Sequence, residues 1–343
     1  MTRITFFIGN GFDLNVGLDT RYEDFYNYYT ENQGDKLAQA IGADYKYWAD
    51  LEEGLGKYTA NVTQEEEDSF WESENKLEEG LADYLEMQME RIHVKDDVHR
   101  DSIAKEMQKS LNQFYMEFPK EQRQDISHII GNIRESITYS FVSFNYTNAL
   151  DLCLEITKNT FPKGSGSHQV GSITYNHSIG SVLHIHGTTE EEMIVGLNDE
   201  GQIANERFRQ NPRYRQWLIK SATNGRFGQN KTKELQDIVN NSSIICIFGM
   251  SLGKTDKMWW ESICKWLSAG PNRRLVIYVK KNMKDVKRVT KRLLFMSQDE
   301  VLDKMKSYSG LDDVAWDKLA KQIYVKFDAK IFDFKLVEEH SDE

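Results

Sequence analysis

The first residues of the chain constrain its fold more than any other segment. Residues 5–8 form a short apolar run, Gly9-Asn10-Gly11 follows it, and a helix-like pattern begins at Phe12. Short apolar runs bounded by glycine are typical of buried parallel strands. A glycine-bracketed turn lets the backbone approach a ligand closely and directs helix N–H groups at an anion. This opening therefore predicts a nucleotide site at the first turn of a sheet.

The composition excludes several classes of protein. Of the 343 residues, 28% are charged and 39% are apolar, a balance typical of a globular chain. The net charge of -11 argues against a surface that coats nucleic acid. No apolar run approaches the roughly 18 residues that span a bilayer, and Cys153, Cys246 and Cys264 form no CxxC pair. We expect a soluble protein of the reducing cytoplasm with no membrane contact.

Short apolar segments alternate with helical patterns through much of the chain. This alternation predicts an α/β fold with an open, mainly parallel sheet and helices on both faces. Residues 323–336 alternate apolar and polar side chains, which predicts an edge hairpin. Strands are expected at residues 5–8, 137–144, 182–186, 193–195, 243–248 and 275–279, and helices at residues 205–221, 233–240, 254–268 and 283–294.

Residues 20–137 differ in character from the segments around them. They are rich in aromatic and acidic residues, and Leu77, Leu81, Leu85 and Met89 recur at a helical spacing. We interpret the segment as a large, mainly helical insertion. The predicted organisation is a nucleotide-binding domain of residues 1–19 and 138–336, the insertion, and a charged tail of residues 337–343.

Two further segments place polar side chains at the ends of expected strands, where open α/β sheets bind their ligands. In the first, Asn145 follows the strand at 137–144 and offers both a donor and an acceptor, although it could equally cap the next helix. In the second, His184 and His186 are expected on one side of a strand, with Gly187 after them. They predict either a catalytic histidine beside a structural one or a metal pair, for which no third ligand is evident.

Gly249-Met250-Ser251-Leu252-Gly253 follows the clearest buried strand, and Asp256 lies in the helix expected after it. The segment contains the G-x-S-x-G pattern of a serine nucleophile. The catalytic histidine of such an enzyme would have to be His340, four residues from the end of a charged tail, which is a poor place for a general base. We favour a glycine turn that holds the sugar or adenine of a nucleotide.

A basic stretch runs from Lys280 to Arg292 on an expected helix. Its pattern favours a solvated helix face, and a contact with nucleic acid or a partner is the alternative.

Four of these segments, in this order, resemble the sirtuin superfamily and, within it, the bacteriophage abortive infection AbiH family. The opening Phe7-Ile8-Gly9-Asn10-Gly11-Phe12-Asp13-Leu14 resembles that of AbiH proteins, and Gly17 falls where sirtuins begin a Gly-Ile-Pro element. Ser143-Phe144-Asn145-Tyr146-Thr147 is similar to the sirtuin Thr-Gln-Asn-Ile-Asp motif, His186-Gly187 to its His-Gly, and Gly249-Met250-Ser251-Leu252 to its Gly-Thr-Ser-Leu loop.

The resemblance implies a sirtuin-like, Rossmann-type sheet that binds NAD. It implies nucleotide contacts from the residues that match the motifs, which are Gly9, Asn10, Gly11, Phe12, Gly17, Thr147, Gly249, Ser251, Leu252 and Asp256. Two positions depart from the pattern, because Thr147 replaces an aspartate and Asp13 replaces a serine. The zinc cysteines of protein-deacylating sirtuins are absent, so we expect no zinc or other metal, and NAD as substrate rather than as cofactor.

Hydrolysis of NAD breaks the nicotinamide–ribose bond through an oxocarbenium-like state, and the charged leaving group needs no acid. We expect Asn145 to orient the water or the ribose, His186 to act as general base, and Asp13 to stabilise the cationic sugar. The predicted function is an NAD hydrolase in a phage-triggered abortive response, with a phage-derived activator and self-association as further expectations. The alternatives are a module that binds NAD or ADP-ribose without cleaving it, and a hydrolase built on Ser251.

Overall fold

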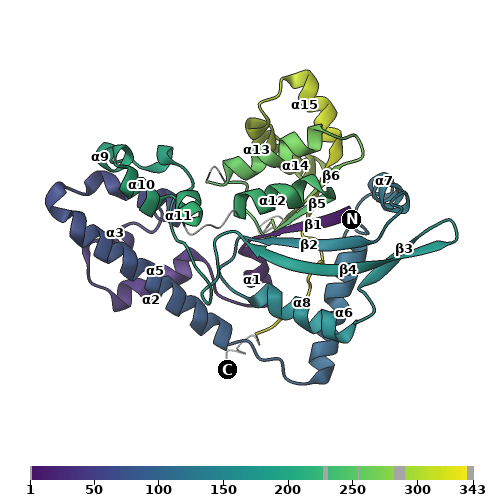
Figure 1. The fold of residues 1–343 in the computed structure, drawn as a ribbon, viewed down its shortest axis with the longest axis horizontal. Coiled ribbons are helices and arrows are strands. Elements are labelled where there is room, and N and C mark those ends of the chain that lie inside the picture. Colours follow the sequence, from purple (N-terminus) through teal and green to yellow (C-terminus); the bar gives the residue numbers. More distant parts are fainter. Residues whose placement is uncertain (1, 227–230, 254, 282–289, 338–343) are drawn as a thin grey trace.

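The computed structural model describes residues 2–226, 231–253, 255–281 and 290–337 (Figure 1). Seven strands in the described chain form one sheet in the order β3-β4-β2-β1-β5-β6-β7. All neighbouring pairs are parallel except β3 and β4. The strands are β1 (Thr2–Ile8), β2 (Ile137–Ser143), β3 (Gly166–Val170), β4 (Ile173–His184), β5 (Ser242–Phe248), β6 (Arg274–Val279) and β7 (Ile323–Phe327).

The order of the parallel strands identifies where the sheet would hold a ligand. Numbered along the chain without the antiparallel β3, the parallel strands lie in the order 3-2-1-4-5-6, which is the order of dinucleotide-binding sheets. The chain therefore changes direction across the sheet between β1 and β5. Ligands of open α/β sheets bind outside the carboxyl ends of the strands at this switch point. The predicted open, mainly parallel α/β fold is confirmed.

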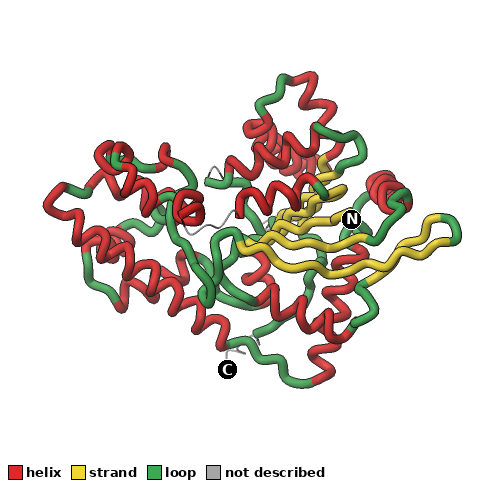
Figure 2. Tube along the Cα trace, viewed as in Figure 1, coloured by secondary structure: helices red, strands yellow, loops and turns green. Residues whose placement is uncertain are grey.

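The central strand explains why the sheet is covered on both faces. In β1, Phe6 and Phe7 are fully buried and point to opposite sides. Phe6 belongs to a core formed with α1 (Gly11–Val16), α6 (Asp97–Gln113), α7 (Lys120–Gly131) and α8 (Ala149–Thr160). Phe7 belongs to a core formed with α12 (Lys231–Asn240), α13 (Lys257–Ser268), α14 (Lys291–Ser309) and α15 (Asp313–Leu319). Figure 2 shows helices on both sides of the sheet.

A second group of helices forms a lobe with its own core, on the left in Figure 1. We call it the helical lobe. Leu77, Leu81 and Leu85 are buried in this core, which confirms the predicted helix. The lobe consists of α2 (Tyr22–Asn32), α3 (Lys36–Ala43), α4 (Leu51–Tyr58), α5 (Glu67–Glu90), α9 (Glu206–Gln210), α10 (Pro212–Leu218) and α11 (Lys220–Arg226), with the 3-10 turns Thr59–Asn61, Gln64–Glu66 and Glu200–Gln202.

The predicted insertion of residues 20–137 divides between two cores. Its helices α2–α5 pack in the helical lobe, whereas α6 and α7 pack against the sheet. Residues 195–218, which lie far from the insertion in sequence, complete the core of the lobe. The lobe therefore joins two segments of the chain that lie on either side of β2 and β4.

Several predicted elements are wrong. Residues 193–195 form no strand, because Met193 and Val195 pack into the helical lobe and only isolated bridges flank them. Residues 323–336 form no hairpin, because β7 ends at Phe327 and Phe332 then enters the core beside Phe12. The apolar alternation there reflects a buried loop.

Other predicted elements have different bounds. The strand predicted at 182–186 begins at Ile173 and ends at His184, and its antiparallel partner β3 is too polar to stand out in the sequence. The helix predicted at 205–221 is three short helices. Most of the basic helix predicted at 283–294 lies outside the described residues. Within the described chain, no helix has the length and apolar character needed to cross a membrane.

Candidate functional site

Three predicted or motif-matching side chains are joined by hydrogen bonds at the carboxyl edge of the sheet, and a fourth follows a neighbouring strand at the same edge. Asp13 lies in α1, directly after β1; Asn145 and Thr147 follow β2; and His186 follows β4. The strands β1, β2 and β4 are parallel neighbours, so the segments after them emerge side by side. The exposed fractions are 1% for Asp13 and Thr147, 7% for Asn145 and 6% for His186. We call these four residues the carboxyl-edge cluster.

Asp13 is the hydrogen-bonding centre of the cluster. Asn145 donates through Nδ2 to Asp13 Oδ1 at 2.8 Å, and Thr147 donates through Oγ1 to Asp13 Oδ2 at 2.7 Å. Burial raises the pKa of Asp13 to about 6, although the bonds from Thr147 and Asn145 act in the opposite direction. The carboxyl group therefore fixes the orientation of the Asn145 amide.

Two polar atoms of the cluster are buried without a hydrogen-bond partner among the described residues. They are Asn145 Oδ1 and His186 Nδ1. The His186 ring packs against Phe144 and Tyr146, with centroid separations of 5.7 and 6.2 Å. Burial, together with the positive charges of Lys220 and Lys231, holds the pKa of His186 well below its ordinary value. The imidazole is therefore neutral at pH 7.

The two histidines that the sequence places on one strand have different surroundings. His184 Nε2 bonds Asp151 Oδ2 of α8 at 2.9 Å, whereas His186 lies in the turn beyond β4. The expectation that both lie on a strand is wrong for His186. Across the described chain no group of three or more His, Cys, Asp or Glu side chains is arranged to hold a metal ion.

The glycine turns after β1 and β5 are in backbone contact at the switch point. Gly11 N donates to Gly249 O at 2.8 Å, and Gly9 N donates to Phe248 O at 3.0 Å. A Cβ added at Gly11 would lie 2.5 Å from Gly249 Cα, so no larger residue fits there. Gly249 has a φ of 71°, in the left-handed region. The structure thus brings together Gly9, Gly11 and Gly249, three of the residues expected to bind a nucleotide.

Four other residues expected to contact a nucleotide have identified contacts within the protein. Asn10 exchanges hydrogen bonds with Thr20, and the Phe12 ring packs in the core against Phe332. Gly17 ends α1 with a φ of 102° and lies against Val337. The side chain of Leu252 is buried in the core around Phe7.

The serine pattern lacks the geometry of a nucleophile turn. Ser251 is exposed, and α13 begins only at Lys257 instead of directly after the serine. His340 lies outside the described residues. Asp256 precedes α13 without capping it, and burial followed by the charge of Glu52 raises its pKa to about 7.

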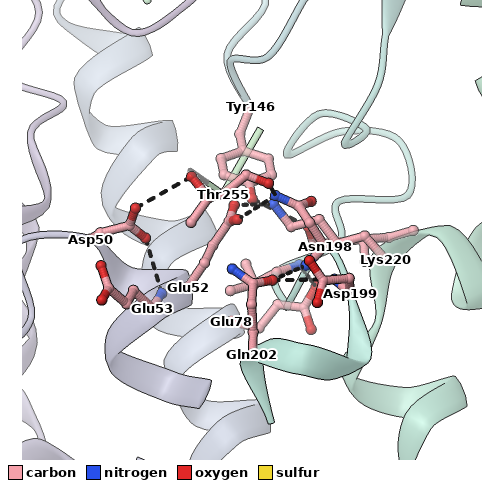
Figure 3. A network of polar contacts seen from close by, with 12 residues as sticks. Asp50, Glu52, Glu53, Glu78, Tyr146, Asn198, Asp199, Gln202, Lys220 and Thr255 are labelled. Carbon is pink, nitrogen blue, oxygen red and sulfur yellow. Dashed lines mark hydrogen bonds and ion pairs between the residues drawn. The ribbon is translucent and has the colours of Figure 1, made fainter. Parts of the chain in front are cut away.

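Sequence reasoning missed a polar network between the helical lobe and the loop after β5 (Figure 3). Lys220 is only 3% exposed and its Nζ pairs with Glu52 Oε1. Asn198 Nδ2 donates to Glu52 Oε2 at 2.9 Å and to Thr255 O at 2.5 Å. No sequence motif marks these residues, because they come from distant segments that only the fold brings together.

The fold and the cluster together define an α/β protein of Rossmann-like topology with a buried polar cluster at the carboxyl edge of its sheet. The family model described as bacteriophage abortive infection AbiH matches residues 5–278. The chain therefore belongs to the AbiH family, as its motifs predict, and the family has a role in abortive infection by phage. No curated protein matches the chain.

Proposed function

We propose that this protein is an NAD hydrolase, which releases nicotinamide and ADP-ribose as the effector step of abortive infection. The observation that carries the proposal is the pair of unpartnered buried atoms, Asn145 Oδ1 and His186 Nδ1, at the end of neighbouring strands. A buried polar atom without a partner costs free energy. A ribose hydroxyl or a water bound at this edge would supply the missing hydrogen bonds.

Three residues of the cluster each take one task in the proposed reaction. The bond between the nicotinamide nitrogen and ribose C1′ breaks, and its electron pair neutralises the pyridinium charge. The oxygen of a water then bonds to C1′, and its proton passes to neutral His186. Asn145 Oδ1 accepts a hydrogen bond from that water or from a ribose hydroxyl, because its Nδ2 is already bound to Asp13. Asp13 thus acts mainly by positioning Asn145.

The two residues that depart from the sirtuin pattern, Thr147 and Asp13, are hydrogen-bonded to one another. This pairing supports a reaction like that of sirtuins at the ribose. Thr147 replaces the sirtuin aspartate and donates its hydroxyl proton to Asp13, which replaces the sirtuin serine. The site thereby keeps one carboxyl group and one hydroxyl group, with their positions exchanged. We infer that the exchange preserves the polarity needed around the ribose.

NAD measured in infected cells tests this function, because infection itself supplies any activator that the enzyme needs. Cells that make the wild-type protein should lose NAD and gain ADP-ribose and nicotinamide after infection, as measured by mass spectrometry. The variants Asn145→Ala and His186→Ala should keep their NAD. His128→Ala is the matched control, because His128 is exposed on α7, away from the cluster.

The proposal is contradicted if the NAD level stays constant in infected wild-type cells and both cluster variants still protect against phage. Thermal stabilisation of the purified protein by NAD, with no product, would instead support the module that binds without cleaving.

A further inference from the structure

The helical lobe covers the carboxyl-edge cluster through the segment that follows β4. Tyr146, directly after Asn145, donates its hydroxyl proton to Ile194 O at 3.2 Å and packs against the core of the lobe. Thr189 N donates to Tyr146 O at 2.9 Å, and Ile194 N donates to His186 O at 2.9 Å. Beside these contacts, Asn145 and His186 are 7% and 6% exposed. A nucleotide reaches them only if this cover moves.

One small group of hydrogen bonds ties the lobe to the loop between β5 and α13. Thr255 belongs to this loop, and its carbonyl oxygen accepts from Asn198 Nδ2 at 2.5 Å. Its hydroxyl donates to Asp50 Oδ2 of the lobe at 3.4 Å. Figure 3 shows Thr255 between these two partners. We call the two contacts the Thr255 tie.

A buried ion pair holds Asn198 in the orientation that the tie needs. Asn198 Nδ2 also donates to Glu52, whose other carboxylate oxygen pairs with buried Lys220. Desolvation offsets much of the attraction between the two charges, so a buried ion pair adds little to the stability of the fold. Its better-established effect is to favour one arrangement of the groups around it. Lys220 also acts electrostatically on His186, so the pair lies close to the cluster.

The loop that carries Thr255 is anchored to the sheet side of the molecule by other bonds. Trp260 Nε1 donates to Gly253 O at 3.0 Å, and Tyr308 donates its hydroxyl proton to Leu252 O at 3.2 Å. Its first residues contact the turn after β1. Loss of the Thr255 tie would therefore remove these contacts between the lobe and the loop, while the loop keeps its own anchors.

We propose that the Thr255 tie is an autoinhibitory contact, which keeps the helical lobe closed over the carboxyl-edge cluster until infection breaks it. The proposal rests on the proposed NAD hydrolase function and states how it is regulated. An enzyme that consumes the NAD of its own cell must be inactive before infection. Weak hydrogen bonds to a single threonine give a closed state that a modest binding energy can open.

Two variants and one control test the tie. Asn198→Ala removes both side-chain bonds of Asn198, and Thr255→Val removes only the hydroxyl with little change of volume. Asn205→Ala is the control, because Asn205 is also half-buried and its Nδ2 bonds Thr59 O and Val62 O within the lobe. All three purified proteins are compared with the wild type for cleavage of NAD and for amide hydrogen exchange of residues 186–198.

We expect faster exchange in both tie variants and NAD cleavage raised about tenfold or more in Asn198→Ala, the effect of a tenfold shift between two states. The control should match the wild type in both measurements. If hydrogen exchange and NAD cleavage are unchanged in both tie variants while infected wild-type cells still lose NAD, the autoinhibitory role of the tie is wrong and the proposed function stands. If exchange is faster in the tie variants but no protein cleaves NAD, either purified or in infected cells, the proposed function is wrong and the tie is only a structural contact.

Discussion

One buried histidine lies near the start of β4 and another lies in the turn beyond its end, and the two differ in how completely they are hydrogen-bonded. His177, near the start of β4, bonds the Tyr139 hydroxyl through Nδ1 and His168 through Nε2, each at 2.9 Å. Tyr139 in turn donates to Asn112 Oδ1 at 3.1 Å. His186, beyond the other end, leaves Nδ1 without a hydrogen-bond partner in the part of the chain that the structure describes.

This difference distinguishes a structural histidine from a candidate catalytic histidine within one sheet. A fully bonded polar network makes the packing around it specific, and its members gain nothing from a ligand. An incompletely bonded site costs stability and gains from whatever completes it. The position of the second site at the carboxyl edge, close to the strand-order switch point, agrees with where such sheets bind ligands. Variants at the two ends of β4 test whether the contrast holds.

The largest expected effect is on catalysis. His186→Ala should lower kcat/KM for NAD cleavage by roughly 10²–10⁴-fold, because a general base is lost. His177→Gln should leave kcat/KM of the folded protein unchanged. The measurement is release of nicotinamide by both variants in the Asn198→Ala background. Equal losses in the two variants would remove the distinction between the two ends of β4.

The stability of the two sites should depend on pH in opposite directions. Burial and the charge of His168 lower the pKa of His177 to about 4. Between about pH 6.5 and 4 the unfolded chain binds the proton and the folded one does not. The wild type should therefore lose up to about 3 kcal/mol, relative to His177→Gln, as the pH falls through this range. Denaturant unfolding at several pH values measures the difference.

Asp13 should give an effect of similar size with the reverse sign. Its pKa is raised to about 6, so the folded protein binds the proton between about pH 4 and 6 and the unfolded chain does not. Stability from this group is present at pH 4 and declines as the pH rises to 6. Relative to Asp13→Asn, the wild type should lose about 3 kcal/mol over that range. If the difference in unfolding free energy between the wild type and Asp13→Asn does not change with pH, Asp13 has the same pKa in the folded and unfolded chains.

A smaller effect tests the glycine contact at the switch point. Gly249→Ala should destabilise the protein by about 2–3 kcal/mol, because the backbone has a positive φ and the new Cβ would lie 2.7 Å from Phe12 N. Gly310→Ala is the matched control, since Gly310 has a φ of 65° with open space around it. That variant should lose only about 1 kcal/mol. If thermal unfolding shows that the two variants lose the same stability, the contact between residue 249 and Phe12 relaxes at no cost.

The sequence predicted the sheet, and it marked Asn145 and His186 as candidate site residues, because both inferences depend on local patterns. Buried parallel strands such as β1 and β5 are short apolar runs, and the polar residues after β2 and β4 stand directly beyond such runs. The helical lobe could not be predicted in this way, because residues 195–218 join it from a distance. The same holds for the Glu52–Lys220 pair, whose partners are 168 positions apart. The segment around Phe332 imitates a strand, since a loop that enters a core can alternate apolar and polar residues.

The most direct test of the proposed site is a crystal structure of His186→Ala in the Asn198→Ala background with NAD bound, since this double variant should admit the nucleotide and leave it uncleaved. We predict the nicotinamide ribose within hydrogen-bonding distance of Asn145 Oδ1 and the diphosphate beside the turn at Gly9. NAD bound elsewhere on the molecule, with Asn145 still buried and unpartnered, would contradict the account.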